Sequence, residues 1–333
     1  MKTRRIVLAS RPKGSPTLDN FRLEDCELPP LAGGDVLVAN RFLSLDPYMR
    51  GRMDEAKSYA KCVALGEVMI GGTVGDVIES RHPKFQPGDA VVGTLGWQEH
   101  ATAEGGTLQK IDPNLAPLSA YLGTLGMPGV TAWVGLLDLA QPKAAETVVV
   151  SAASGAVGSV VGQLAKLHGA RAVGIAGGPA KCAYVRDELG FDACIDYKAG
   201  DFADELKAAC PKGIDVYFEN VGGMVLDTVL RYMNPFGRIS VCGLISQYNA
   251  ANADELYGIR SFRSILMNRL RVQGFIVSDR MELWPRARKD LAGWYRDGRL
   301  KYRETVADGL ANAPAAFLGL LRGENLGKQL VRL

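Results

Sequence analysis

The sequence predicts an α/β protein in which a doubly wound parallel sheet follows a β-rich domain. From about residue 147 to residue 277, segments with the apolar pattern of buried strands alternate with segments of helical spacing. The first of these strands runs into a turn of small residues and then a helix, as in a dinucleotide-binding fold. Before residue 118, many short strands are separated by turn sequences such as Gln86-Pro87-Gly88-Asp89.

The turn behind this prediction lies within 147–166, in the sequence TVVVSAASGAVGSVVGQLAK. Its first four residues are β-branched and suit a buried parallel strand. The run Ala152-x-x-Gly155-x-x-Gly158 follows, and apolar residues then recur at helical spacing. Small residues let the backbone approach a pyrophosphate, and the helix start supplies N–H groups and a partial positive charge. An ordinary, closely packed strand–helix turn is the alternative interpretation.

The end of the second predicted strand, 171–176, indicates which dinucleotide is bound. A site for NAD usually places an acid there, on the ribose 2′-hydroxyl. No acid occurs between Arg171 and Arg186, and the strand is followed by Gly177-Gly178-Pro179-Ala180-Lys181. A lysine attracts the 2′-phosphate that a carboxylate repels, so the sequence predicts NADP(H). The alternative is that Lys181 is a solvated lysine at a helix start.

The other elements follow from the same patterns. In the first domain we expect strands at 6–10, 21–27, 35–40, 68–79, 89–95, 97–103 and 107–111. A helix at 131–140 precedes the alternating part, which adds strands at 193–196, 214–219, 238–242 and 271–277 and helices at 181–190, 201–209 and 224–233. The tail, with helices at 284–296 and 314–321 around a strand at 301–306, leaves this rhythm, which allows it to pack back on the first domain.

Composition argues against several other classes of protein. The chain has 333 residues, 47% hydrophobic and 23% charged, a net charge of +3, and no basic run typical of nucleic-acid binding. No stretch suits a membrane span or a secretory signal. Six cysteines and three histidines are scattered without a C-x-x-C pair, which argues against a metal site and favours reduced thiols. We therefore expect a cytoplasmic protein without nucleic-acid, membrane or metal partners.

A loop in the first domain carries side chains suited to a ligand. Tyr48 and Arg50 follow a turn at Asp46-Pro47, on a loop or short helix. Their phenol and guanidinium groups can face a substrate. The alternative is a tyrosine with a satisfied hydroxyl and a surface arginine.

Two stretches at predicted strand ends belong at the carboxyl edge of the sheet, where ligands of such folds bind. Asn220 ends one strand and suits a ribose or nicotinamide, although an Asx turn is an equal alternative. The next strand ends in Cys242-Gly243-Leu244-Ile245-Ser246-Gln247-Tyr248-Asn249. There Gly243 permits close backbone approach and Tyr248 suits proton donation, whereas Cys242 is best interpreted as a small buried hydrophobe.

Taken together, these motifs resemble the medium-chain dehydrogenase/reductases, in the zinc-independent branch of prostaglandin, alkenal double-bond and curcumin reductases. The similar stretches are LSLDPYMRGRM, SAASGAVG, GIAGG-x-x-K, YFENVGG, CGLISQYN, VQGFIVSD and GENLGK, in that order. The resemblance implies a GroES-like catalytic domain at 1–122, a Rossmann domain for NADPH at 123–295, and a C-terminal segment, 296–333, that returns to the catalytic domain. It also implies a homodimer with NADPH in the interdomain cleft.

The resemblance also implies roles for single residues. Tyr48, Arg50 and Tyr248 would face the substrate, with Tyr48 and Tyr248 as catalytic candidates. Cofactor-binding residues would be Gly155, Ala156, Val157, Gly158, Gly178, Lys181, Tyr197, Asn220, Cys242, Gly243, Ile245, Ser246, Tyr248, Phe275, Ile276, Val277 and Asn325. Met267 stands where relatives carry a tyrosine, so the proton must come from elsewhere. Zinc enzymes of the superfamily have a G-H-E motif, which Leu65-Gly66-Glu67 lacks.

The expected activity is NADPH-dependent reduction of the C=C bond of α,β-unsaturated aldehydes or ketones, with alkenal-, curcumin- or prostaglandin-like substrates. Hydride would add to the β-carbon while polar groups hold the carbonyl oxygen. Quinone reduction on the same scaffold is one alternative. A non-catalytic NADPH-binding protein is another, because a fold does not fix a function.

Overall fold

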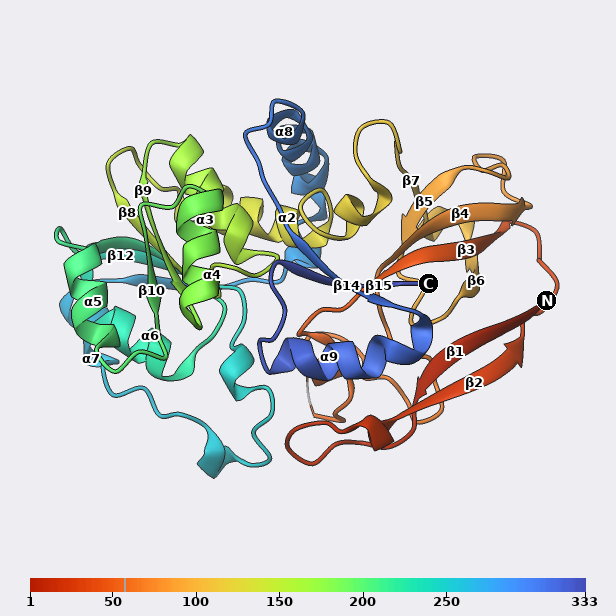
Figure 1. The fold of residues 1–333 in the computed structure, drawn as a ribbon, viewed down its shortest axis with the longest axis horizontal. Helices are drawn as coiled ribbons and strands as arrows, with labels where there is room; N and C mark the ends of the chain where they lie inside the picture. The colour runs from red at the N-terminus through yellow and green to blue at the C-terminus, as the bar shows by residue number, and fades with distance from the viewer. Residues whose placement is uncertain (57) are drawn as a thin grey trace. The chain divides into compact units, whose positions relative to one another are not determined.

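The computed structural model describes residues 1–56 and 58–333, which form two compact units (Figure 1). The first unit contains residues 1–123, 304–325 and 329–333. The second unit contains residues 124–303 and 326–328. The first unit contains a seven-stranded and a two-stranded sheet, and the second unit contains a six-stranded sheet.

The second unit is built on a six-stranded parallel sheet in the order β10-β9-β8-β11-β12-β13. The chain therefore starts in the middle of the sheet and winds outward in both directions, which confirms the predicted Rossmann architecture. Its strands are β8 (Thr147–Ser151), β9 (Arg171–Ala176), β10 (Ala193–Asp196), β11 (Ile214–Glu219), β12 (Met233–Val241) and β13 (Arg271–Gly274). Its helices are α2 (Met127–Trp133), α3 (Gly158–Leu167), α4 (Pro179–Ala183), α5 (Phe202–Ala209), α6 (Gly223–Leu230), α7 (Arg263–Met267) and α8 (Trp284–Arg296).

The centre of this sheet is also the centre of the unit's core. Every residue of β8 is buried, and Val148, Val149 and Val150 are fully shielded from solvent. On the neighbouring β11, Tyr217 and Phe218 are fully shielded as well. A parallel strand that is covered on both faces needs such a continuous apolar run. The sequence of β8 therefore predicts a strand.

Several predicted elements of this unit have different bounds in the structure. The helix expected at 224–233 ends at Leu230 as α6, and the strand expected at 238–242 begins at Met233 as β12. The helix expected at 131–140 begins at Met127 as α2 and continues as a helical segment, Val134–Ala140. Pro128 suits the first turn because its missing N–H would have no helical partner there. The strand expected at 271–277 ends at Gly274, and a short helical segment begins at Val277.

The first unit contains a seven-stranded antiparallel sheet and a separate two-stranded ribbon, β1–β2. This confirms the predicted GroES-like, β-rich architecture. The strands are β1 (Lys2–Leu8), β2 (Phe21–Glu27), β3 (Asp35–Ser44), β4 (Thr73–Ser80), β5 (Ala90–Gly93), β6 (His100–Glu104), β7 (Gln109–Lys110), β14 (Glu304–Asp308) and β15 (Lys328–Arg332). The described residues of this unit also form the helices α1 (Met49–Arg52) and α9 (Ala313–Leu321).

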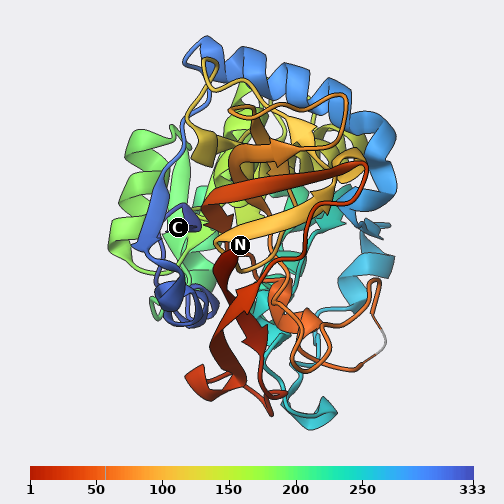
Figure 2. The ribbon, with the colours of Figure 1, turned by 90° about the vertical axis from the view of Figure 1, so that its right-hand side faces the viewer.

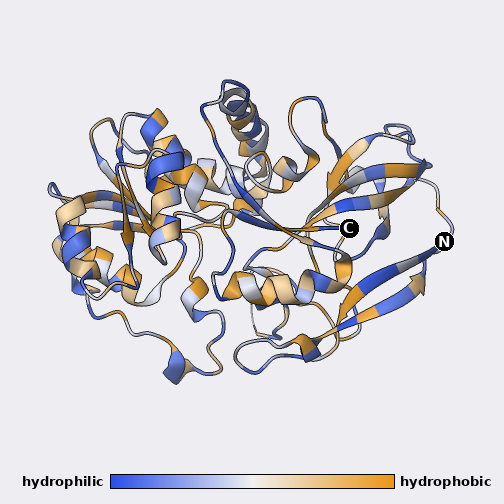
Figure 3. Ribbon diagram, viewed as in Figure 1, coloured by the Kyte–Doolittle hydropathy of each residue, from blue (hydrophilic) through white to orange (hydrophobic). Residues whose placement is uncertain are grey.

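The core of the first unit joins the ribbon to the tail of the chain. Trp97 is fully buried, and its ring stacks on Phe21 of β2 with centroids 5.4 Å apart. Phe317 of α9 meets the Trp97 ring edge-on at 5.7 Å. Hydrophobic and hydrophilic residues intermingle along β2, as the orange and blue segments of Figure 3 show. β15 pairs antiparallel with β3, so the end of the chain completes the sheet of this unit.

The longest helix of the described residues is α8, with 13 residues, seen as the long blue helix at the top of Figure 2. Across residues 1–56 and 58–333, no helix is long and apolar enough to cross a membrane.

Candidate functional site

Most of the predicted cofactor residues lie at one edge of the six-stranded sheet. Because the strands are parallel, their carboxyl ends share that edge. The predicted residues follow β8 (155–158), β9 (178 and 181), β10 (197), β11 (220), β12 (242–248) and β13 (275–277). Six stretches spread over more than 120 residues of sequence are thus brought to one edge.

The turn after β8 is shaped by close contacts of its own backbone. Ala152 has a left-handed φ of 50°, a conformation that favours glycine, and it occupies the place where the usual fingerprint begins with glycine. Gly155 N–H donates to Ala152 O at 2.9 Å. A Cβ on Gly158 would lie 2.3 Å from the same oxygen, so only glycine fits at the first residue of α3. These contacts explain the Ala-x-x-Gly-x-x-Gly spacing.

A segment near the end of the chain supports this turn, which sequence reasoning missed. Gly327 N–H donates to Ser154 O at 2.9 Å, and Gly327 forms a parallel bridge with Gly155. Gly327 has φ 74°, and a Cβ there would lie 1.9 Å from Arg303 O. The signal in the sequence was the GENLGK motif. Asn325, predicted to contact the cofactor, lies two residues before this contact.

The ends of β9 and β10 bring together the residues predicted to bind the 2′-phosphate. A Cβ on Gly177 would lie 2.9 Å from the Tyr197 ring and 3.0 Å from Lys198 Cε, so both side chains cover the glycine turn. Lys181 lies on α4, which begins directly after that turn. Partial burial lowers the pKa of Lys181, and the positive charge of Lys198 lowers it further. The two lysines therefore act on each other electrostatically, and both would attract a dianionic ligand at the end of β9.

The ends of β8 and β11 share a buried polar network. Ser151 donates to Glu219 Oε1 at 2.8 Å, and Val221 N–H donates to the same oxygen at 2.6 Å. Asn220 donates from its backbone N–H to Ser151 Oγ and from Nδ2 to Ser151 O, each at 2.8 Å. Burial raises the pKa of Glu219, while hydrogen bonds from Val221 and Gly222 N–H favour its ionised form. One N–H of Asn220 Nδ2 is engaged here, which leaves its second N–H and the oxygen Oδ1 for a bond to a cofactor hydroxyl.

The loop after β12 folds its own tyrosine inward. Leu244 N–H donates to the Tyr248 hydroxyl at 3.3 Å, and a Cβ on Gly243 would lie 2.9 Å from the same hydroxyl. The absence of a side chain at Gly243 therefore leaves room for the Tyr248 hydroxyl. This is a second reason for glycine here, in addition to the predicted approach of the backbone to a ligand. Ser246 donates to Val221 O at 2.6 Å, which ties the loop to the end of β11. Burial raises the pKa of Cys242 to about 12, so its thiol stays protonated near neutral pH.

The residues that follow β13, Phe275 to Val277, are held by contacts with other parts of the second unit. The ring of Phe275 packs edge-on against Phe218 of β11, with centroids 6.2 Å apart. A Cβ on Gly135 would lie 2.6 Å from the tip of the Phe275 ring. The side chain of Phe275 therefore packs against Phe218 and Gly135, and its backbone N–H donates to Val241 O at 3.3 Å. Val277 O accepts a hydrogen bond from Trp284 Nε1 at 3.1 Å.

In the first unit, the two predicted substrate residues differ in their surroundings. Tyr48 is half-buried at the start of α1, and burial raises the pKa of its hydroxyl, with the carboxylate of Asp46 adding to the effect. Arg50 is 2% exposed. Its guanidinium donates to Asp54 at 2.6 Å and to Gly14 O at 2.8 Å. These contacts give Arg50 a role inside the domain, and its contact with a substrate stays a prediction.

Comparison with known proteins agrees with this architecture. Residues 4–111 match the model of the N-terminal domain of oxidoreductase, and residues 156–292 match the model of zinc-binding dehydrogenase. The chain is 48% identical to an NADPH-dependent curcumin reductase of Escherichia coli, over 100% of this chain and 97% of the relative. It is 45% identical to prostaglandin reductase 1 of Rattus norvegicus, over 96% of each chain.

Two further relatives extend the comparison. A 2-alkenal reductase (NADP(+)-dependent) of Nicotiana tabacum is 42% identical over 99% of this chain and 97% of the relative. The crystal structure of CurA in complex with NADPH from Vibrio vulnificus has 49% identity and a TM-score of 0.94, covering 99% of this chain and 98% of that chain. The chain belongs to the medium-chain dehydrogenase/reductases. Within that family it groups with the curcumin, prostaglandin and alkenal reductases.

Some medium-chain dehydrogenase/reductases bind zinc, as the description of one matching model says. In this chain Glu67, at the place of the G-H-E motif, accepts a hydrogen bond from Ala64 N–H at 3.0 Å. Within the part of the chain that the structure describes, no group of three His, Cys, Asp or Glu side chains could hold a metal ion. The six cysteines are all free.

Met267, which stands in place of the relatives' tyrosine, ends α7 and is 53% exposed. Its thioether has no ionisable proton to give. For this medium-chain reductase, the predicted sources of the proton therefore stay the hydroxyls of Tyr248 and Tyr48, a cofactor hydroxyl or water.

Proposed function

We propose that this protein is an NADPH-dependent reductase of the C=C bond of α,β-unsaturated aldehydes and ketones. The observation that carries the proposal is full-length identity of 42–48% to relatives named as curcumin and 2-alkenal reductases that use NADP. The crystal structure of a 49% identical protein, which contains NADPH, supports the choice of cofactor.

The residues at the sheet edge fit the proposed cofactor. The donor set at the end of β9 combines Lys181 and Lys198 with the ring of Tyr197, and no acid occurs between Arg171 and Arg186. That set suits a 2′-phosphate, and the stretch after β9 lacks the acid that usually holds a free ribose 2′-hydroxyl. The start of α3, with Gly155 and Gly158, suits the pyrophosphate. We propose that the remaining predicted cofactor residues line the ribose and nicotinamide.

In the proposed mechanism, protein groups stabilise the charge that develops on the substrate. Bound NADPH supplies a hydride, which adds to the β-carbon. The hydroxyl of Tyr248 or Tyr48 donates a hydrogen bond to the carbonyl oxygen as enolate charge develops there. The raised pKa of Tyr48 keeps that hydroxyl protonated near neutral pH, as a donor must be. The α-carbon then takes a proton from a tyrosine hydroxyl or from water.

We also propose that the protein is a homodimer that pairs through β13. This strand lies at the end of the sheet order, and exposed apolar side chains surround it. Their exposed fractions are 76% for Leu266, 66% for Phe262 and for Phe236, 53% for Met267 and 44% for Val272. Such an edge is favourable for pairing with a second copy about a two-fold axis. Light scattering of the wild type and of Val272→Lys tests this: a dimer that dissociates on substitution supports it, and a monomeric wild type contradicts it.

Turnover with chemically distinct acceptors tests the proposed activity. The loss of NADPH absorbance is measured with alkenals, enones, curcuminoids and quinones, and each product is identified by NMR. We expect oxidation of NADPH with enals or enones and a saturated carbonyl product. An allylic alcohol would mean that the enzyme reduces the carbonyl group. Activity confined to quinones would favour the alternative activity, quinone reduction. Either result contradicts the proposal.

A further inference from the structure

Asp196, the last residue of β10, ties two loops together through one carboxylate oxygen. Its Oδ1 accepts a hydrogen bond from Gly178 N–H at 2.8 Å and another from Lys198 N–H at 3.0 Å. Gly178 follows β9 and Lys198 follows β10, so the carboxylate bridges the ends of neighbouring strands. Neither the family resemblance nor the comparisons assign this residue a role.

The two loops that Asp196 joins carry the cations of the predicted phosphate site. Gly178 has φ 95° and immediately precedes α4, whose third residue is Lys181. The other loop carries Tyr197 and Lys198, which lie against Gly177. A shift of either loop changes the distance between the two lysines. A hydrogen bond that fixes both loops therefore fixes the geometry of the pair.

A carboxylate next to a phosphate site is unfavourable on charge alone, so its position needs a reason. In an NAD site the acid at the end of the second strand accepts hydrogen bonds from ribose hydroxyls. Here the acid stands on the next strand, and its Oδ1 is engaged by two backbone N–H groups. Hydrogen bonds of this charged type are among the stronger ones in proteins.

We propose that Asp196 is a positioning residue for cofactor specificity. It holds the Gly178 turn and the Lys198 loop together so that Lys181 and Lys198 present their charges to one 2′-phosphate. The proposal rests on the proposed use of NADPH. Lys198 is then a second cation for the phosphate, beside Lys181. The competing hypothesis is that Asp196 itself accepts hydrogen bonds from an unphosphorylated ribose.

Binding of nucleotide fragments tests this without turnover. The dissociation constants of 2′,5′-ADP and 5′-AMP are measured by calorimetry on the full-length protein, for the wild type, Asp196→Ala and Asp196→Asn. We expect Asp196→Ala to weaken 2′,5′-ADP about tenfold, the loss of roughly one charged hydrogen bond, and to change 5′-AMP less than about twofold. Asp196→Asn keeps an oxygen acceptor and should retain most of the preference. Lys198→Gln should lower the affinity for 2′,5′-ADP alone.

Asp192 offers a matched control for a purely structural effect. It precedes the same strand, accepts from Ala172 N–H at 2.8 Å and pairs with Lys166 at 2.8 Å, at the opposite end of the β9–β10 pair. We expect Asp192→Ala to lower the melting temperature and leave the ratio of the two dissociation constants unchanged. If Asp196→Ala does not fold, Asp196→Ser replaces it, because its shorter side chain cannot reach both N–H groups.

The outcomes separate the inference from the proposed function. A wild type that does not prefer 2′,5′-ADP over 5′-AMP contradicts the proposed use of NADPH. A wild type that prefers it, with an unchanged ratio in Asp196→Ala or its serine replacement, contradicts the positioning role. Tighter binding of 2′,5′-ADP by the variant, or weaker binding of 5′-AMP, supports the competing hypothesis and overturns the inference.

Discussion

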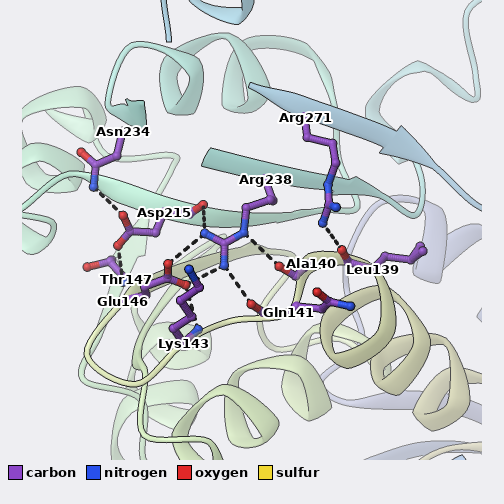
Figure 4. Close-up of polar contacts among 10 residues, drawn as sticks. All are labelled: Leu139, Ala140, Gln141, Lys143, Glu146, Thr147, Asp215, Asn234, Arg238 and Arg271. Atoms are coloured by element: carbon purple, nitrogen blue, oxygen red, sulfur yellow. Dashed lines mark hydrogen bonds and ion pairs between the residues drawn. The ribbon is translucent and has the colours of Figure 1, made fainter. Parts of the chain in front are cut away.

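The two ends of the six-stranded sheet use charged residues in opposite ways. At the amino end, Arg238 donates to Glu146 at 2.6 and 3.0 Å and to the carbonyl oxygens of Ala140 and Gln141 at 3.0 and 2.9 Å (Figure 4). Asp215 accepts from Thr147 N–H at 2.8 Å. There, opposite charges are paired with one another and with backbone groups.

The carboxyl end is arranged differently. Small residues form the turns, Glu219 is buried among hydrogen bonds, and like-charged Lys181 and Lys198 act on each other electrostatically. Like charges repel each other, and a ligand of opposite charge relieves that repulsion. The comparison teaches that the amino end uses charged side chains to join the strands, whereas the carboxyl end combines glycine turns, a buried carboxylate and two neighbouring lysines, as a dinucleotide site would need. Substitutions at the two ends test that lesson.

The largest effect should come from Lys181→Ala at the carboxyl end. Loss of a charged hydrogen bond to phosphate costs about 1.5–3 kcal/mol, which raises the Michaelis constant for NADPH roughly ten- to a hundredfold. The constant for NADH should barely change. Lys143→Ala, at the amino end, is the matched control and should leave both constants unchanged. Equal losses with NADPH and NADH would mean that Lys181 serves folding or the pyrophosphate.

Substitution of the tyrosines should have the next largest effect. Losing one transition-state donor typically costs about 2.7–4 kcal/mol, or roughly a hundred- to a thousandfold in turnover. We expect Tyr248→Phe and Tyr48→Phe to lower turnover on an enone by less than this, because water partly replaces the hydroxyl. The affinity for NADPH should stay nearly intact. Normal turnover in both variants would shift the role of donor to a cofactor hydroxyl.

At the amino end, Arg238→Met should change stability and leave catalysis unaffected. Burial acts to raise the pKa of Glu146, but hydrogen bonds from Arg238 and from Lys143 N–H outweigh it and hold the pKa below its usual range. This stabilisation is present above the ordinary glutamate pKa and is lost as the pH falls through the lowered value. We expect a loss of about 2 kcal/mol in the free energy of unfolding at neutral pH, smaller in acid. Denaturant titrations at several pH values measure it; a raised Michaelis constant for NADPH would contradict the comparison.

The sequence predicted what depends on local pattern. The buried run of β8, the glycine turn and the absence of an acid after β9 all lie within about 40 residues and need no tertiary information. The tertiary partners could not be predicted in the same way. Ser151 and Asn220 are 69 residues apart, and only the strand order shows that their strands are neighbours.

Arg50 shows the opposite difficulty. Its position after a turn suggested exposure, and its guanidinium is instead buried on Asp54 and Gly14. An arginine is expected at the surface by default. Only the fold identifies the hydrogen-bond partners that compensate for burial of its charge. Polar residues at the ends of apolar strands, such as Ser151, Asp196 and Glu219, were the signal available in the sequence, and it needed the strand order to be interpreted.

Removal of metal ions is expected to have the smallest effect, and unchanged turnover after removal would be informative. One matching family model is described as zinc-binding, yet position 66 is a glycine followed by Glu67, without the histidine of the zinc motif. The proposed chemistry places hydrogen-bond donors at the carbonyl oxygen, where a zinc enzyme would place its metal. We therefore expect full turnover after dialysis against a chelator, with elemental analysis of the same sample as the control. Stoichiometric zinc that is lost together with activity would show that the charge on the oxygen is stabilised by a metal, and the roles proposed for Tyr48 and Tyr248 would fail with it.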